Sequence, residues 1–144
     1  MNSIVQTLLA LATIAATTAR VVAAGPQCPP TIDVRQQLTA PVSGWTSIDE
    51  DSPYRLANVT FYDGRPQDHV SLVPDTSRKS GDHETSTWQF TLQSDRRVWI
   101  ACQYGSTSIS LAQELPAGTR ACTVVYNLRQ RVDGLPIIES VNCK

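Results

Sequence analysis

Apolar and polar residues alternate along much of the chain, which is the pattern of β-strands that bury one face. In residues 55–62, Ala57, Val59 and Phe61 fall on one face, whereas Asn58 and Thr60 fall on the other. The same period of two returns in residues 32–38, 69–73, 88–92, 98–104, 109–115, 120–128 and 137–143. Because no convincing amphipathic helix of ten residues interrupts these stretches, the pattern predicts about eight short strands.

Turn-forming residues separate these stretches. Asp63-Gly64 and Asp133-Gly134 are dipeptides favoured in tight hairpins, because they tolerate positive φ angles. Residues 75–86 are polar and show no periodicity, so we expect one long exposed loop there. Residues 110–115 fit a strand, with a single helical turn as the alternative.

Strands and turns together predict an all-β fold, an antiparallel meander that forms a barrel or a strongly curved sheet. With 144 residues the chain suffices for one domain. Alternation places eight side chains in the expected core, namely Val59, Phe61, Trp88, Phe90, Ile100, Val124, Tyr126 and Ile137.

The first 24 residues differ from the rest. Residues 4–18 are uncharged and rich in Leu, Ile, Ala and Thr, and Val22-Ala23-Ala24 follows. An apolar run before small residues is typical of a secretory signal peptide, although the usual basic start is missing and Arg20 follows the run. The alternative is an uncleaved anchor, for which the run is short. We therefore expect a signal peptide at 1–24, a single β-rich domain at 25–144 that is periplasmic or secreted, and no stable membrane anchor after cleavage.

Four cysteines, Cys28, Cys102, Cys122 and Cys143, follow the expected cleavage site. An even number of cysteines in an exported chain predicts two disulfides that staple the domain. Their wide spacing does not fit zinc ligands, which come in close pairs. Of the three possible pairings we favour Cys102–Cys122 and Cys28–Cys143. Both inner cysteines fall on the apolar face of their strands, and the other pair would then join the ends of the domain.

A series of short motifs runs from the first cysteine to the end of the chain. They are Cys28-Pro-Pro-x-Ile-x-Val34, Gly44-Trp45, Phe61-Tyr-Asp-Gly-x-Pro66, Ser71-Leu-Val-Pro-Asp75, Trp99-x-x-Cys-x-Tyr104, Cys122-x-Val-x-Tyr126 and Cys143-Lys144. Together they resemble a small family of uncharacterised exported proteobacterial proteins that is named after a locus of the typhoid Salmonella. The resemblance implies a bacterial, exported, cysteine-bridged domain and brings no activity, substrate or catalytic residue with it.

Residues suited to catalysis or metal binding are few. The histidines are His69 and His83, and the neighbours of His83 in Asp82-His83-Glu84 cannot easily converge with it on one ion. The chain has no Gly-x-Ser-x-Gly elbow and no cysteine left for a Cys–His pair. A formal net charge of −1 with scattered arginines is not a nucleic-acid footprint. We therefore predict no catalytic, cofactor-binding or metal-binding residues, no cofactor and no nucleic-acid partner.

Aromatic and acidic residues near predicted loops are better candidates for contact with a protein partner in the envelope. Trp45 stands beside a loop, and Trp99 points away from the apolar face of its strand. Asp49, Glu50 and Asp51 form an acidic run that suits a cationic cleft. We therefore predict a non-enzymatic exported binding or inhibitory module of the bacterial envelope, an inhibitor or immunity-type protein. The alternative is a small envelope hydrolase whose site is assembled from distant residues.

Overall fold

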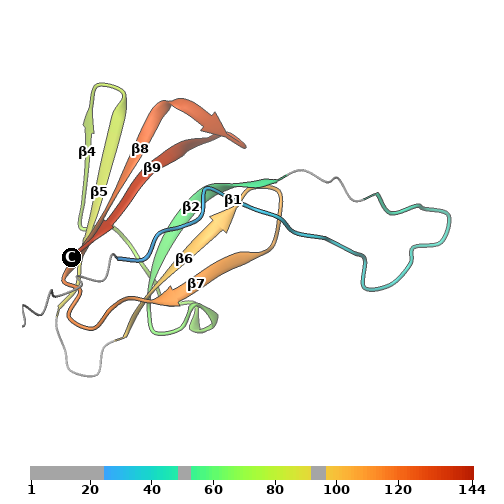
Figure 1. The fold of residues 1–144 in the computed structure, drawn as a ribbon, viewed down its shortest axis with the longest axis horizontal. Helices are drawn as coiled ribbons and strands as arrows, with labels where there is room; N and C mark the ends of the chain where they lie inside the picture. The colour runs from blue at the N-terminus through green and yellow to red at the C-terminus, as the bar shows by residue number, and fades with distance from the viewer. Residues whose placement is uncertain (1–24, 49–52, 92–96) are drawn as a thin grey trace, which may run out of the picture.

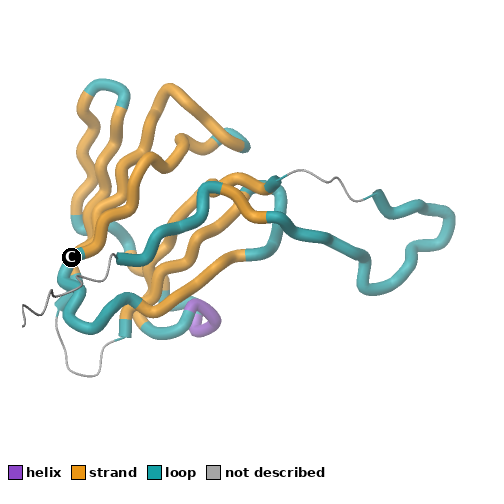
Figure 2. The backbone as a smooth tube through the Cα atoms, viewed as in Figure 1, coloured by secondary structure: helices purple, strands orange, loops and turns teal. Residues whose placement is uncertain are grey.

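The computed structural model describes residues 25–48, 53–91 and 97–144, so the predicted signal peptide and the acidic run lie outside the described residues. Within them, β-strands and one short 3-10 helix, η1 (Pro66–Asp68), form two antiparallel sheets (Figures 1 and 2). The first sheet contains β1 (Thr31–Ile32), β2 (Tyr54–Asp63), β3 (Ser71–Leu72), β6 (Val98–Tyr104) and β7 (Ser110–Glu114). The second contains β4 (Thr76–Ser80), β5 (His83–Gln89), β8 (Ala121–Val132) and β9 (Leu135–Cys143). The predicted all-β antiparallel class is confirmed, whereas the described strands close no barrel.

The core lies where the inner faces of the two sheets meet. Phe61 of β2 and Ile100 of β6 are paired neighbours in the first sheet, and both are fully buried. Trp88 of β5 packs on Phe61 from the second sheet, with 4.9 Å between the ring centroids. The Trp88 indole Nε1 donates a hydrogen bond to the Leu72 carbonyl at 3.1 Å, so this large side chain is buried without an unpaired donor.

The structure buries six of the predicted core residues, which are Val59, Phe61, Trp88, Phe90, Ile100 and Val124. Tyr126 and Ile137 are half-buried instead. The β8–β9 register shifts between Val125 and Tyr126 and again after Asn127. A one-residue shift moves the later side chains of a strand to the other face. The alternation in the sequence therefore predicts more burial for Tyr126 and Ile137 than the structure shows.

Residues 75–86 form a hairpin, which corrects the prediction of one long loop. β4 pairs with β5 from Thr76–Thr87 to Ser80–His83, and Gly81 supplies the positive φ of 57° at the connecting turn. All residues of β4 are exposed. An edge strand with no buried face has no reason to alternate, so the sequence carries no strand signal there.

The strand expected at 32–38 is reduced to the short β1, because only Thr31 and Ile32 pair with β2. The remaining turn and strand predictions agree more closely with the structure. Asp133 and Gly134 both adopt positive φ, 50° and 81°, and join β8 to β9 as the sequence predicts. Asp63-Gly64 also ends a strand, but η1 lengthens the connection before the two-residue β3 returns. Residues 110–114 are a strand, not a helical turn.

The disulfides join Cys28 to Cys102 and Cys122 to Cys143, so the predicted count of two is confirmed and the predicted pairing is wrong. Cys102 and Cys122 both point into the core, as alternation requires, but they belong to different sheets. Cys122 lies directly opposite Cys143 in the β8–β9 ladder, and the N-terminal segment brings Cys28 to Cys102. The alternation within one strand shows which face is buried. It does not show which sheet the strand joins, and the pairing of the cysteines depends on that.

No helix among the described residues is long and apolar enough to cross a membrane.

Candidate partner-binding surface

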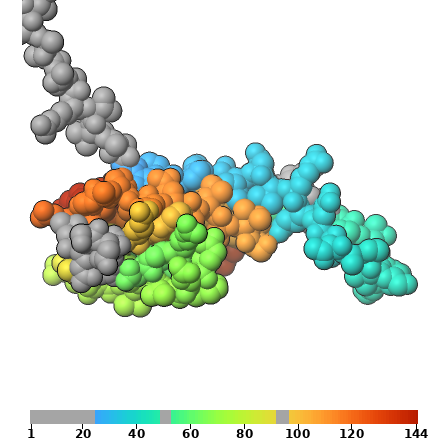
Figure 3. Space-filling model, turned by 90° about the horizontal axis from the view of Figure 1, so that it is seen from below, coloured from blue at the N-terminus to red at the C-terminus, as the bar shows by residue number. Residues whose placement is uncertain are grey.

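The chain between β1 and β2 leaves the two sheets and projects as an arm, which we define as residues 36–48 (Figures 1 and 2). The space-filling view shows this segment protruding from the body (Figure 3). The arm carries no charged residue. Its large apolar side chains are nevertheless exposed: Leu38 57%, Val42 52%, Trp45 81% and Ile48 84%. Exposed apolar side chains grouped in this way are typical of interaction sites.

The tip of the arm is an ordered turn. The Trp45 amide donates a hydrogen bond to the Val42 carbonyl at 3.1 Å. Gly44, third in this four-residue turn, has a φ of 79°, which a type II turn requires at that position and which glycine adopts without strain. The turn therefore brings Val42 and Trp45, its first and last residues, close together at the end of the arm.

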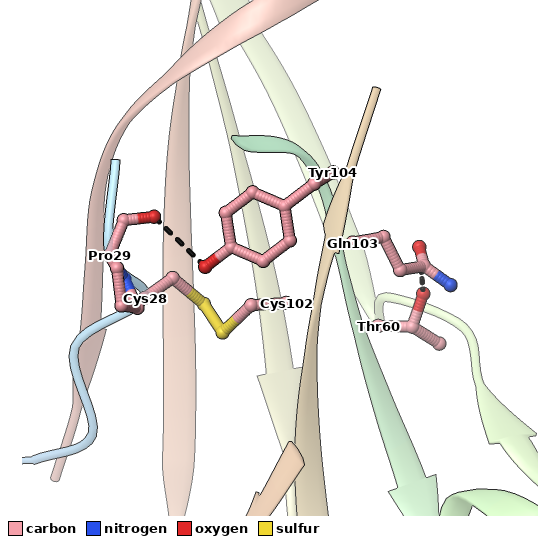
Figure 4. Close-up of a disulfide and its surroundings, with 6 residues drawn as sticks. All are labelled: Cys28, Pro29, Thr60, Cys102, Gln103 and Tyr104. Carbon is pink, nitrogen blue, oxygen red and sulfur yellow. Dashed lines mark hydrogen bonds between the residues drawn. A yellow bond between two sulfur atoms is a disulfide. The ribbon is translucent and has the colours of Figure 1, made fainter. Parts of the chain in front are cut away.

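The base of the arm is fixed to the first sheet. Upstream, the Cys28–Cys102 disulfide ties the chain to β6, and the Tyr104 hydroxyl donates to the Pro29 carbonyl at 3.0 Å (Figure 4). Burial raises the pKa of Tyr104, so this phenol remains a donor at neutral pH. At the base itself, the Gln36 side-chain amide donates to the Tyr54 hydroxyl at 2.9 Å.

A groove of about 620 Å³ lies beside the base of the arm. Its walls come from the arm, from the β6–β7 turn at Gly105 and Ser106, and from the β8–β9 turn at Val132 and Asp133. A Cβ at Gly105 would collide with the Asp133 carboxylate, so a larger residue there would require that side chain to move. The two turns are therefore packed closely together beneath the arm.

Trp99 lies on the outer face of the first sheet, where it is half-buried beside its cross-strand partner Tyr62. Further along this face, Gln103 accepts a hydrogen bond from Asn58 at 2.7 Å. It accepts a second one from Thr60 at 3.3 Å (Figure 4). The face is thus aromatic and amide-rich, with its polar groups already paired.

The structure does not bring all the predicted contact residues together. The arm enters β2 at its Tyr54 end, whereas Trp99 pairs with Tyr62 eight residues further along. At about 3.3 Å per residue, the two places are roughly 25 Å apart. Trp45 therefore belongs to the arm and Trp99 to a separate patch. The acidic run at 49–51 lies outside the described residues, directly after the arm in sequence.

Sequence analysis found Trp45 but missed the other apolar residues of the arm, Leu38, Val42 and Ile48. Residues 40–53 contain proline, glycine and an acidic run, which in a sequence are typical of a loop. The signal that identifies the arm is the uncharged stretch of 36–48 with four large apolar residues and no sustained alternation.

Neither histidine has the surroundings of a catalytic base. His69 is exposed in the β2–β3 connection, with a φ of 59°, and it does not line the groove beside the arm. His83 Nε2 lies 3.2 Å from Glu139 on the solvent-facing side of β5. This placement gives no support to the hydrolase alternative.

The sequence triplet Asp82-His83-Glu84 is not a metal site in this structure. Asp82 pairs with Arg129 at 2.7 Å, and Glu84 lies 3.7 Å from Lys79. Each side chain thus faces a different partner. Among the residues described, no three histidine, cysteine, aspartate or glutamate side chains are grouped so that they could hold an ion.

Comparison with known proteins identifies two similarities. The sequence profile of a family described as type VI secretion system Tli immunity protein matches residues 50–144. A protein of Azospirillum brasilense, described as an uncharacterized 16.3 kDa protein in the trpG 5' region, is 29% identical over 104 residues. The aligned region is 68% of this chain and 69% of that protein. No solved structure matches the chain.

The profile match spans the two sheets apart from β1 and begins after the arm. These similarities support a family relationship, while the expected naming after a Salmonella locus is not confirmed.

Proposed function

Because the chain belongs to the type VI secretion system Tli immunity protein family, we propose that it is an exported protein that binds and neutralises a toxin of that secretion system. The family match over residues 50–144 is the observation that carries this proposal, and it confirms the predicted inhibitor or immunity-type function. An inhibitor of this class acts by occupying a surface of its partner, so the chain needs a rigid scaffold and an exposed contact region.

We place the action of the protein in the envelope, and specifically in the periplasm. Two disulfides support this location, since disulfides form and persist in oxidising compartments and are rare in the cytosol. The signal-peptide pattern of residues 1–24 supports it from the sequence.

A protection assay tests the proposed function. A strain that lacks this protein and receives the toxins of its own secretion system should lose viability, and the wild-type chain directed to the periplasm should restore it. Each toxin, purified separately, should be titrated with the protein by calorimetry, and one of them should form a complex. A protein that binds none of these toxins and gives no protection would refute the proposal.

The acidic run Asp49-Glu50-Asp51 is proposed to speed the encounter with a basic region of the toxin. Replacing these residues with Asn, Gln and Asn should slow association and weaken its dependence on ionic strength, because steering by opposite charges is screened by salt. Surface plasmon resonance at low and physiological salt measures both effects. An association rate that is unchanged at low salt would show that the run does not face the toxin.

Trp99 remains a proposed contact as well. Because it lies in a separate patch of the first sheet, it would meet the toxin only through a second area of contact.

A further inference from the structure

An exposed apolar segment needs an explanation, because solvation alone favours polar side chains in such a place. The arm combines four large exposed apolar residues, Leu38, Val42, Trp45 and Ile48, with the absence of any charge from 36 to 48. Figure 3 shows that the arm protrudes from the body of its own chain. Leu38 and Ile48 also line the groove at its base, whereas Val42 and Trp45 do not. The arm therefore has the apolar, uncharged composition of a buried segment, although its large side chains are exposed.

The geometry of the arm is that of a preorganised projection. Its base is held by the Gln36–Tyr54 hydrogen bond and by the pairing of β1 with β2 directly upstream, and its tip by the Val42–Trp45 turn. A segment that is already ordered loses less conformational entropy on binding than a mobile one. Tryptophan at the end of such a segment is among the residues that most often dominate the energy of an interface.

The position of the arm in the sequence bears on its role. The family profile begins at residue 50, so what the family shares is the two-sheet body, and the arm precedes it. A part outside the shared scaffold is suited to distinguish one partner from another, because it can vary without disturbing the core.

The composition of the arm indicates which kind of partner could bind it. A membrane-binding segment is rich in Lys and Arg on its polar side, which attract anionic lipids. The arm has neither residue, and three acidic residues follow it in the sequence. Uncharged chemistry of this kind fits the apolar interior of a protein cleft, where an unpaired charge would be costly to desolvate.

On the basis of the proposed function, we infer that the arm is the toxin-recognition element. Its tip, with Val42 and Trp45, inserts into an apolar cleft of the toxin, and Leu38 and Ile48 line the entrance of that cleft. Blocking a cleft with a rigid projection would neutralise a toxin by occupancy alone.

Trp45→Ala is the test, and Val73→Ala is the matched control, because Val73 is as exposed as Trp45 (81% in both) and lies between β3 and β4. Each toxin of the producing strain's type VI secretion system, purified separately, is titrated with wild type and both variants by calorimetry. We expect Trp45→Ala to weaken binding about 30-fold or more, as for the loss of an interface hot spot. Val73→Ala should bind within about twofold of wild type, since surface changes outside an interface have small effects.

The outcomes separate this inference from the proposed function. If wild type binds a toxin and Trp45→Ala binds it equally well, the arm is not the recognition element, and the proposed function stands. If wild type binds no toxin and does not protect, the proposed function fails, and the inference fails with it.

Two further measurements examine the competing occupants. Sedimentation of the free protein would overturn the inference if it showed a dimer that Trp45→Ala dissociates, because a second copy would then occupy the arm. Binding of wild type but not Trp45→Ala to vesicles of phosphatidylethanolamine and phosphatidylglycerol would overturn it in favour of a membrane surface. We expect a monomer that does not bind the vesicles.

Discussion

At the scale of single residues, the three tryptophans of the chain have different environments. Trp88 is buried between the sheets, with its ring against Phe61 and its indole nitrogen bonded to the Leu72 carbonyl. Trp99 is half-buried on the outer face, and Trp45 is exposed on the arm. A change at each position should therefore affect a different property of the protein.

Trp88→Ala should lower the free energy of unfolding by about 3–5 kcal/mol, because it leaves a large cavity between the two sheets. Trp45→Ala, the matched exposed change, should alter it by less than about 0.5 kcal/mol. Urea unfolding followed by circular dichroism measures both. A Trp88→Ala protein as stable as wild type would place this side chain outside the core.

At the scale of elements, the two disulfides have different tasks. Cys122–Cys143 joins two strands that are already paired in a ladder, across 21 residues of sequence. Cys28–Cys102 closes a loop of 74 residues and fastens to β6 the N-terminal segment that leads into the arm. The first disulfide reinforces one sheet, and the second connects the N-terminal segment to the other.

Replacing each pair of cysteines by serine should distinguish these tasks. In the chain-entropy description, loss of Cys28–Cys102 costs about 4.5 kcal/mol and loss of Cys122–Cys143 about 3.4 kcal/mol, since the longer loop restrains the unfolded chain more. Unfolding in urea gives the order of stability. Peptide mapping under non-reducing conditions checks the pairing itself, and a peptide that links Cys102 to Cys122 would contradict the structure.

Toxin binding adds a second readout for the same variants. Under conditions in which both are folded, the Cys28/Cys102 variant should bind the toxin more weakly, because the segment that leads into the arm is then held only by the β1–β2 pairing and the Gln36–Tyr54 hydrogen bond. The Cys122/Cys143 variant should bind like wild type.

At the scale of the whole molecule, the described chain begins close to where it ends. Gly25 lies against Cys143, and Pro26 is buried. The ends of the domain do meet, as the predicted Cys28–Cys143 disulfide required, although no bond joins them. An unprocessed segment of 24 residues would have to leave from this point.

The mature protein is therefore expected to begin at Gly25, within about two residues of the small-residue site Val22-Ala23-Ala24. N-terminal sequencing of the protein recovered from the periplasm measures this directly. Recovery of intact Met1 in the membrane fraction would show that residues 1–24 serve as an anchor.

The sequence by itself determined the fold class, most of the core and the number of disulfides. Alternation is a local consequence of burying one face of a strand, so Val59, Phe61, Ile100 and Val124 could be placed without knowing their neighbours. Asp133-Gly134 was predictable for the same reason, since a tight hairpin depends only on the residues within it. Trp45 could be proposed as a contact residue from its place beside a loop.

Only the tertiary structure decided which strands share a sheet, and the remaining differences follow from that. Cys102 and Cys122 each point inward from a different sheet, and their partners are set by how the chain passes between the sheets. β4 has no buried face and therefore no pattern. The exposure of the arm could not be predicted from the sequence either. Apolar residues in a sequence indicate burial, but they do not identify the surface that buries them. In this chain the two sheets bury their inner faces against each other, whereas Leu38, Val42, Trp45 and Ile48 of the arm are exposed.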